Sequence, residues 1–429
     1  MAKKRDRQAA SNRRKNQVVS SDQHDIVGDS SSDRRLITIF VVFFVISPAI
    51  SVLVYFKYAS NGEISGAPAY DPGLFKTDIN YQEILAEHSN VAENASRRRY
   101  DYPVLAYITP WNSRGYDMAK KFNSKFTHLS PVWYDLKSHG SSLVLEGRHN
   151  ADQGWISELR LTGDALVLPR VVIEAFPTDL LRKKKLKDKA IDLIVTECKE
   201  MGYDGIVLES WSRWAAHGIL HDPDLRTLAL QFINQLGNAL HSELESRRSK
   251  QRLQLVYVIG PPHSENLQKH DFGPQDFHSL NGAVDGFSLM TYDFSSPQNP
   301  GPNAPLNWIR STLRLVLGTK DNRLVQHNAG KIFLGINFYG YDFSLSGGGG
   351  AITGRDYVSL LEKYKPMVQW EKNSAEHYFL YEDDNHKRHA VFYPSLKSIF
   401  TRLEEARSLG TGISIWEIGQ GLDYFFDLL

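Results

Sequence analysis

Eight short apolar segments constrain the fold of this chain more than any other feature of its sequence. They are residues 102–111, 126–135, 165–176, 203–211, 253–262, 284–294, 331–343 and 412–419. Most are almost continuously apolar, which is typical of parallel strands covered on both faces. Stretches with apolar residues at helical spacing separate them, among them 180–202, 225–247 and 396–410. We therefore predict an α/β fold, a (β/α)8 TIM barrel, over residues 99–429.

An open, doubly wound parallel sheet is the competing fold for such an alternation. That fold commonly carries a G-x-G-x-x-G loop after its first strand, and none follows 102–111. The glycine run Gly347–Gly350 lacks the Gly-Lys-Ser/Thr ending of a phosphate-binding loop, so we interpret it as a flexible loop. The barrel is therefore the favoured fold.

The interval between the last two predicted strands is long enough to hold extra elements. It contains a helical pattern at 354–364 and two strand-like runs at 377–382 and 389–394. A polar DDNHKR turn joins the two runs, which indicates a hairpin. We predict a small insertion between strands seven and eight, on the side where a barrel builds its functional site.

The N-terminal region predicts a membrane anchor. Residues 1–35 are polar and expected to be disordered, whereas residues 36–56 contain no charge and span about 30 Å as a helix, the thickness of a bilayer core. The long basic lead favours an uncleaved transmembrane signal-anchor over a cleaved signal peptide or a buried core helix, with the N-terminus in the cytosol. We predict a single-pass type II membrane protein of the secretory pathway, in the Golgi or endoplasmic reticulum, with its barrel lumenal or extracellular. Residues 57–98 are interpreted as a lumenal stalk with a glycosylation sequon at Asn94.

The charge balance and the cysteine count argue against several kinds of site. Lys and Arg total 50 against 49 Asp and Glu, so the net charge of +1 gives no case for a nucleic-acid partner. The single cysteine, Cys198, can form no internal disulfide and lies in a helical pattern, where we expect an inert thiol. The histidines form no H-E-x-x-H motif and no close His–Asp cluster of ligand spacing, so we expect no metal and no cofactor. His128, within a strand, is interpreted as a core histidine.

Aromatic residues and carboxylates gather where the predicted strands end, which is where this fold places functional groups. The aromatic residues are Tyr107, Trp111, Trp133, Tyr134, Trp211, Trp214, Tyr292, Tyr339, Tyr341 and Trp416. The carboxylates are Glu174, Glu209, Asp293 and Glu417. Aromatic rings suit the apolar faces of sugars, and paired acids are what glycoside hydrolysis generally needs. A plain aromatic rim that packs the insertion onto the barrel is the alternative.

Four sequence features resemble glycoside hydrolase family 18, the family of chitinases. They are MTYD at Met290–Asp293, GINFYGYDF at 335–343, Trp416 near the end of the eighth strand, and Asp204-Gly205 on the fourth. The resemblance covers all eight strands, and within the family the sequence looks most like the chitinase domain-containing protein 1 branch. It implies a (β/α)8 barrel with a site for chains of N-acetylglucosamine.

The resemblance also implies roles for residues on the fourth strand. Family members carry D-G-x-D-x-D-x-E there; the last Glu donates a proton, and the Asp two residues earlier orients the substrate's acetamide, which also bonds to the Tyr of MTYD. Here Glu209 takes the place of that Asp and Trp211 the place of that Glu. Since two strand residues span about 6.6 Å, Glu209 should not reach the acid's position. We expect Glu209 to orient an acetamide or to be a buried carboxylate held by Tyr292, and Trp211 to add a stacking surface.

Three functions follow from these patterns. The favoured one is a protein that binds N-acetylated oligosaccharides without cleaving them. The second is a glycosidase with a relocated acid, for which Glu209 and Glu174 are the candidates. The third is a protein-interaction scaffold with no role in sugar binding. The residues expected to bind the sugar are Tyr107, Trp111, Trp133, Glu209, Trp211, Met290, Tyr292, Asp293, Tyr339 and Trp416.

Overall fold

The computed structural model describes residues 73–91, 96–243, 252–318 and 327–429. All of them belong to one unit, residues 66–429. The predicted tail and signal-anchor, residues 1–56, and the sequon at Asn94 lie outside the described residues and stay predictions. Within the described residues, no helix is both long enough and apolar enough to cross a bilayer.

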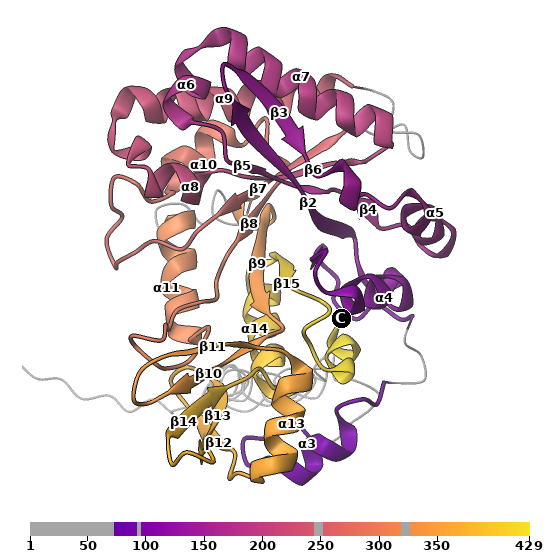
Figure 1. The fold of residues 1–429 in the computed structure, drawn as a ribbon, viewed down its shortest axis with the longest axis vertical. Coiled ribbons are helices and arrows are strands. Elements are labelled where there is room, and N and C mark those ends of the chain that lie inside the picture. The colour runs from indigo at the N-terminus through magenta and orange to yellow at the C-terminus, as the bar shows by residue number, and fades with distance from the viewer. Residues whose placement is uncertain (1–72, 92–95, 244–251, 319–326) are drawn as a thin grey trace, which may run out of the picture. The chain divides into compact units, whose positions relative to one another are not determined.

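Eight parallel strands close into a barrel, as the alternation of segments predicted (Figure 1). The strands are β1 (Val104–Ile108), β2 (His128–His139), β5 (Arg170–Ile173), β6 (Gly205–Glu209), β7 (Gln254–Ile259), β8 (Gly286–Leu289), β9 (Ile332–Asn337) and β15 (Gly412–Trp416). Their order around the ring follows the chain, and β1 closes it by pairing with both β15 and β2. Two further strands pair with β2, β3 (Ser142–Glu146) and β4 (Leu166–Val167).

Helices connect the strands and pack against the outside of the ring. They are α4 (Ser113–Lys121), α5 (Gln153–Thr162), α6 (Pro177–Arg182), α7 (Lys184–Met201), α8 (Trp211–Ala216), α9 (Pro223–Ser242), α10 (Pro274–Leu280), α11 (Leu306–Leu317) and α14 (Leu396–Leu409). Asp222 caps α9 by accepting hydrogen bonds from the backbone N–H groups of Asp224 (2.9 Å) and Leu225 (3.3 Å). α14 ends at Gly410, whose φ of 70° supplies a left-handed cap.

The strands alternate between a core inside the barrel and a larger core under the helices. The inner core contains Leu105, Tyr107, Leu168, Val207, Val256, Val258 and Phe333. Ile206 and Leu208, the neighbours of Val207 on β6, face the outer core instead. His128 is a satisfied core histidine, as predicted, with Thr127 Oγ1 at 2.8 Å and Gln254 Oε1 at 3.0 Å. Cys198 is buried on α7.

The predicted insertion between the last two barrel strands is a separate antiparallel sheet with one helix. It comprises β10 (Gly340–Ser344), β11 (Gly349–Ile352), α13 (Gly354–Tyr364), β12 (Gln369–Glu371), β13 (Glu376–Glu382) and β14 (Arg388–Phe392). The strand order is β11-β10-β14-β13-β12, so the predicted hairpin is its β13–β14 pair. Figure 1 shows these strands and α13 together at one end of the unit.

The interpretation of Gly347–Gly350 as a flexible loop is wrong for its second half. Gly349 and Gly350 begin β11, which pairs with β10. Gly349 has a φ of 129°, and a Cβ there would lie 2.3 Å from the carbonyl oxygen of Asp342, so the pairing requires glycine. Glycines have no side chains whose alternation could indicate a strand, so this strand could not be predicted from the sequence pattern.

Part of the predicted stalk packs onto the barrel unit. The helix α3 (Tyr81–Glu87) buries Ile84 in the main core, and a capping box formed by Asn80 and Glu83 fixes its start. The segment before it contributes Leu74 and Ile79 to the same core. The backbone oxygen of Thr77 also lies 3.2 Å from Nε2 of His377 on β13. Residues 73–91 are therefore integral to the folded unit.

Candidate functional site

Glu209 is the last residue of β6, where its side chain continues the inward face begun by Val207. It is only 6% exposed, and its Oε2 accepts a hydrogen bond from the guanidinium of Arg170 in an ion pair. Arg170 is the first residue of β5 and lies beside Val207 in the sheet, so its long side chain reaches along the interior to the end of the next strand. The alternative that Tyr292 holds Glu209 is wrong, because the side chains that donate to Glu209 are those of Arg170 and, at 3.5 Å, Ser212. The signal that was missed is a single charge within the apolar run VLPRVVI.

Three predicted aromatic residues surround this ion pair. The centre of the Arg170 guanidinium lies 5.3 Å from the ring of Trp416, which is half-buried at the end of β15. Trp416 packs on Tyr107 at 5.1 Å, and Tyr107 donates a hydrogen bond to Ser288 Oγ (2.8 Å). Burial raises the pKa of Tyr107 to about 12 and raises that of Tyr292, while it lowers the pKa of Arg170. These side chains form the floor of the barrel mouth.

Asp293 follows β8 and stands at the rim. Its carboxylate accepts hydrogen bonds from the hydroxyl groups of Tyr339 and Tyr341, the latter at 2.8 Å. Its backbone N–H donates to Asn303 Oδ1 (2.7 Å), which holds Asp293 at a φ of 62°. The ring of Tyr339 also packs on Tyr292 at 6.1 Å. The structure thus brings together predicted residues that follow β8 (Asp293) and β9 (Tyr339) and one on β10 (Tyr341).

Trp211 does not continue the inward face of β6, contrary to expectation. The strand ends at Glu209, and Trp211 is the first residue of α8, where the backbone turns its side chain out of the alternation. The indole is 3% exposed, packs on Phe272 at 5.1 Å and donates its N–H to the backbone oxygen of His270 (3.0 Å). Position 211 therefore does not place a side chain on the inward face of β6.

Trp133 lies outside the barrel mouth, so its assignment to the sugar site is wrong. The pairing of β2 with β5 shifts register between Val132 and Tyr134, and this bulge turns Trp133 into the outer core. There it packs on Trp155 at 5.9 Å and donates to Tyr116 Oη (2.8 Å). A bulge leaves no mark in the apolar pattern of the segment.

Three other predicted residues lie away from the barrel mouth. Trp111 follows β1 and is 70% exposed; it lines a different cavity together with Arg114 and the start of α13. Glu174, the alternative acid, is exposed at the end of β5 and forms an ion pair with Arg213 of α8 (2.8 Å). Glu417 is turned away from the mouth and fully buried, where it accepts a hydrogen bond from Asn112 Nδ2 (2.5 Å).

A cavity of about 590 Å³ opens at the ends of β7 and β8, next to this floor. Its wall includes Trp211, Met290 and Asp293, which links it to the predicted site. Phe294 and Trp308 also line it, with their rings 5.2 Å apart. The sequence analysis selected neither residue: Phe294 is the last residue of the apolar segment 284–294, five residues after β8 ends at Leu289, and Trp308 lies on α11, away from any strand end.

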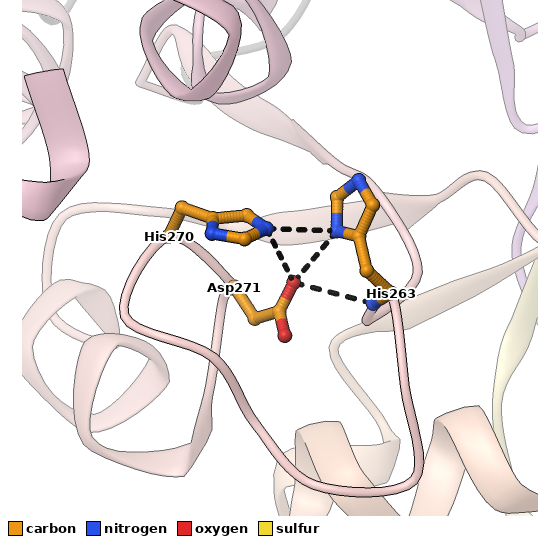
Figure 2. A group of neighbouring side chains, drawn as sticks. All are labelled: His263, His270 and Asp271. Carbon is orange, nitrogen blue, oxygen red and sulfur yellow. Dashed lines mark hydrogen bonds and ion pairs between the residues drawn. The ribbon is translucent and has the colours of Figure 1, made fainter. Parts of the chain in front are cut away.

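A His–Asp cluster forms on the wall of the same cavity, although the sequence analysis expected none. His263, His270 and Asp271 bring two imidazole nitrogens and one carboxylate oxygen within 4.8 Å of one another. Figure 2 shows the contacts of both rings converging on Asp271 Oδ1. The signal in the sequence is HSENLQKHD, whose spacing resembles no short metal motif because a loop, not a helix, brings the residues together.

Comparison with known proteins establishes the family. Residues 177–421 match the model of glycosyl hydrolases family 18. The chain belongs to this family. The matched segment contains β6 to β15 and the insertion, and therefore most of the mouth described above.

Relatives and structural neighbours of this family 18 protein are glycosylases and chitinases. It is 25% identical over 253 residues to an uncharacterised glycosylase of Bacillus subtilis, which covers 58% of this chain and 66% of the relative. It is 23% identical over 277 residues to a cortical fragment-lytic enzyme of the same species, covering 62% of this chain and 58% of that enzyme. The matches thus span less than two thirds of either relative.

Two solved structures show the same fold at low sequence identity. A chitinase from Chromobacterium violaceum aligns with a TM-score of 0.62 at 20% identity, over 76% of this chain and 97% of that chain. A family 18 chitinase from Cycas revoluta, solved with a tetramer of N-acetylglucosamine, aligns with a TM-score of 0.60 at 14% identity, over 76% and 97%.

Proposed function

We propose that this family 18 protein binds oligosaccharides containing N-acetylglucosamine at the barrel mouth and does not hydrolyse them. The observation that carries the proposal is the ion pair between Glu209 and Arg170, together with the absence of a carboxylate at position 211. We assign the chain to the chitinase domain-containing protein 1 branch of the family on the motifs MTYD and YDGIVLESW.

Glu209 is poorly suited to donate a proton. A general acid has to carry its proton at the working pH, usually because an apolar environment disfavours the charged form. An ion pair with a guanidinium does the opposite, since it stabilises the carboxylate. Glu209 is thus built to accept hydrogen bonds, from Arg170 and from a donor on a bound sugar.

The rest of the mouth retains features that suit a sugar. Trp416 offers a half-buried indole above the floor, and Phe294 and Trp308 offer further rings on the cavity wall. Asp293 presents an exposed carboxylate fixed by two tyrosines, which can accept hydrogen bonds from hydroxyl or amide groups. The Cycas revoluta chitinase, which has this fold, was solved with a tetramer of N-acetylglucosamine.

The binding test uses isothermal titration of the full-length chain with the N-acetylglucosamine tetramer. We expect saturable binding, weakened about 5- to 30-fold in Trp416→Ala, because a lost stacked indole removes roughly 1–2 kcal/mol. Trp370→Ala is the matched control: Trp370 is also half-buried, but it lies on β12 at the edge of the insertion sheet. Equal affinity in Trp416→Ala and wild type would contradict the site, and no binding at all would favour the scaffold.

Hydrolysis with a relocated acid is the alternative, and the same protein tests it. We expect no product from a fluorogenic chitotrioside after long incubation. Turnover that is lost in Glu174→Gln or Glu209→Gln would identify the acid and overturn the binding-only function. Glu174 is a poor candidate for the acid, because it is exposed and its carboxylate forms an ion pair with Arg213.

We further propose that the barrel is lumenal and that residues 36–56 anchor the chain in a membrane of the secretory pathway. The support is the uncharged stretch 36–56, preceded by a basic segment. In cells, the anchored chain should resist protease added to sealed microsomes and should lose apparent mass on endoglycosidase treatment, unless Asn94 is changed to Gln. Digestion of the barrel in sealed microsomes would reverse the assigned orientation.

A further inference from the structure

We propose that His263, His270 and Asp271 form a binding site for a divalent transition metal ion of the zinc type. The proposal does not depend on the sugar function, although the cluster lies on the wall of the same cavity. Two imidazole nitrogens and a carboxylate oxygen are donors that Zn²⁺ and its neighbours prefer over Ca²⁺ or Mg²⁺.

The three donor atoms have the spacing of ligands around one ion. His263 Nδ1 lies 2.9 Å from Asp271 Oδ1 and 3.2 Å from His270 Nε2, and the third side, His270 Nε2 to Asp271 Oδ1, is 3.7 Å. The circle through these atoms has a radius of about 1.9 Å, so an ion at zinc distances, about 2.0–2.1 Å from each, fits just above their plane. Its ligand–metal–ligand angles would be roughly 90–130°, around the tetrahedral value.

The carboxylate is positioned before any ion binds. The side chain of Asp271 is 1% exposed. Its Oδ2 accepts a hydrogen bond from the backbone N–H of Gln268 (2.7 Å), and its Oδ1 accepts one from that of His263 (3.3 Å). These bonds close the loop 263–271 on itself and direct Oδ1 at both rings (Figure 2). A fixed carboxylate lowers the entropy lost when a metal binds.

The two imidazoles are incompletely satisfied without an ion. The nitrogens of His263 and His270 that face each other can share only one proton, yet both also face the same carboxylate oxygen. A cation at the centre would engage both facing nitrogens and the oxygen at once.

The surrounding charge does not oppose a cation. Arg226 lies behind the loop and donates to the backbone oxygen of Asp271 (3.0 Å), but its own charge is matched by Asp276 at 2.5 Å. The side chain of His263 is 69% exposed, and all three residues line the cavity, so solvent reaches the remaining coordination positions. Three protein ligands with accessible positions are typical of zinc sites that retain a bound water.

The test is Zn²⁺ binding to the full-length chain, purified without a polyhistidine tag and followed by equilibrium dialysis. We expect one Zn²⁺ per chain with a Kd in the micromolar range or below, weakened at least 30-fold in His263→Ala and in His270→Ala. Because the side chain of His263 is exposed, His263→Ala is expected to fold like the wild type. His278→Ala, which removes an exposed histidine of the nearby α10, should change the Kd less than two-fold.

A second readout separates a metal site from a merely structural cluster. Co²⁺ bound by two nitrogens and an oxygen should give a visible absorption band that disappears in His263→Ala. No saturable binding of Zn²⁺ at 100-fold molar excess would overturn the proposal. So would a His263→Ala variant that binds Zn²⁺ within three-fold of the wild-type affinity.

Discussion

Replacing Glu376 by glutamine is expected to lower the free energy of unfolding by about 3–5 kcal/mol, because it breaks a buried ion pair by removing one charge. Glu376 begins β13 of the insertion and lies 3.0 Å from the guanidinium of Arg402 on α14 of the barrel. Their side chains are 7% and 3% exposed. Burial raises the pKa of Glu376 and lowers that of Arg402, so each charge depends on the other.

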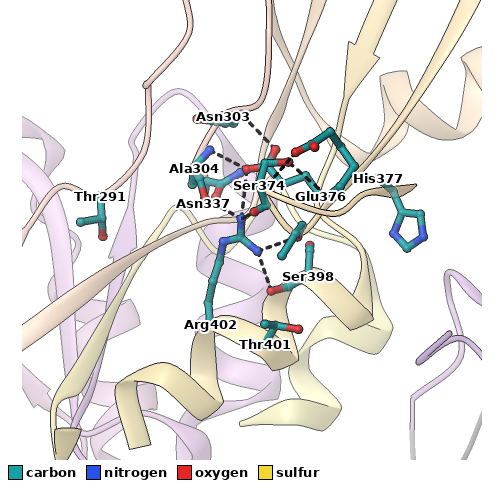
Figure 3. Close-up of polar contacts among 12 residues, drawn as sticks. Thr291, Asn303, Ala304, Asn337, Ser374, Glu376, His377, Ser398, Thr401 and Arg402 are labelled. Carbon is teal, nitrogen blue, oxygen red and sulfur yellow. Dashed lines mark hydrogen bonds and ion pairs between the residues drawn. The ribbon is translucent and has the colours of Figure 1, made fainter. Parts of the chain in front are cut away.

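The other hydrogen bonds of this pair require two acceptor oxygens at position 376, which a glutamine does not have. Arg402 donates to the backbone oxygens of Ala304, Ala375, Ser374 and Ser398 (Figure 3). Glu376 accepts from the backbone N–H groups of Asn303 (2.9 Å) and Ala304 (2.7 Å). A glutamine would turn one N–H₂ group toward these donors and would leave the Arg402 charge without a counter-charge.

Urea unfolding followed by tryptophan fluorescence measures the loss of unfolding free energy in Glu376→Gln. Glu382→Gln is the matched control, since Glu382 lies on the same strand but pairs with His386 at the surface and should cost less than about 1 kcal/mol. A loss below 1 kcal/mol in Glu376→Gln would show that the pair contributes nothing. Because Asn303 also holds the backbone of Asp293, the variant should weaken sugar binding as well.

Local patterns predicted the elements of this fold, because burial on two faces and helical periodicity are properties of short segments. All eight strands and the β13–β14 hairpin appear where the sequence placed them. The predicted residues Tyr107 and Trp416, from two neighbouring strands, lie in contact, since strand ends in a parallel barrel converge.

The predictions failed where the direction of a side chain depends on how its segment pairs with other strands, or on where the strand ends. A bulge on β2 turned Trp133 outward, and the end of β6 at Glu209 freed Trp211 from the alternation. The partner of Glu209 depends on the register between β5 and β6, which no spacing along one strand reveals. The His263–Asp271 cluster depends on the path of a loop, which has no periodicity at all.

The second large effect concerns Glu417, which should make the protein less stable as the pH rises from about 4.5 to 7. Its side chain is fully buried next to Trp416, and this burial raises its pKa from 4.5 to about 7. In that pH range the unfolded chain has lost the proton while the folded chain keeps it. The free energy of unfolding therefore falls with pH in this window, by about 3 kcal/mol in total, and stays constant above it.

Glu417→Gln removes this titration and keeps the shape of the side chain. Its oxygen can still accept from the backbone N–H of Gly419, as Glu417 does at 2.9 Å, and the Asn112 amide can rotate to receive the new N–H₂ group. The difference in unfolding free energy between variant and wild type cancels the other titrating groups. We expect this difference to shift by about 3 kcal/mol in favour of the variant between pH 4.5 and pH 8.

Urea unfolding at four pH values across this range gives the difference directly, with Glu382→Gln as an exposed control whose difference should stay nearly flat. A constant difference for Glu417→Gln would mean that Glu417 is ionised throughout, balanced by Arg114, the cation that acts against its burial. A difference that shifts in favour of the variant as the pH rises would instead show that folding keeps Glu417 protonated in the acidic part of this range.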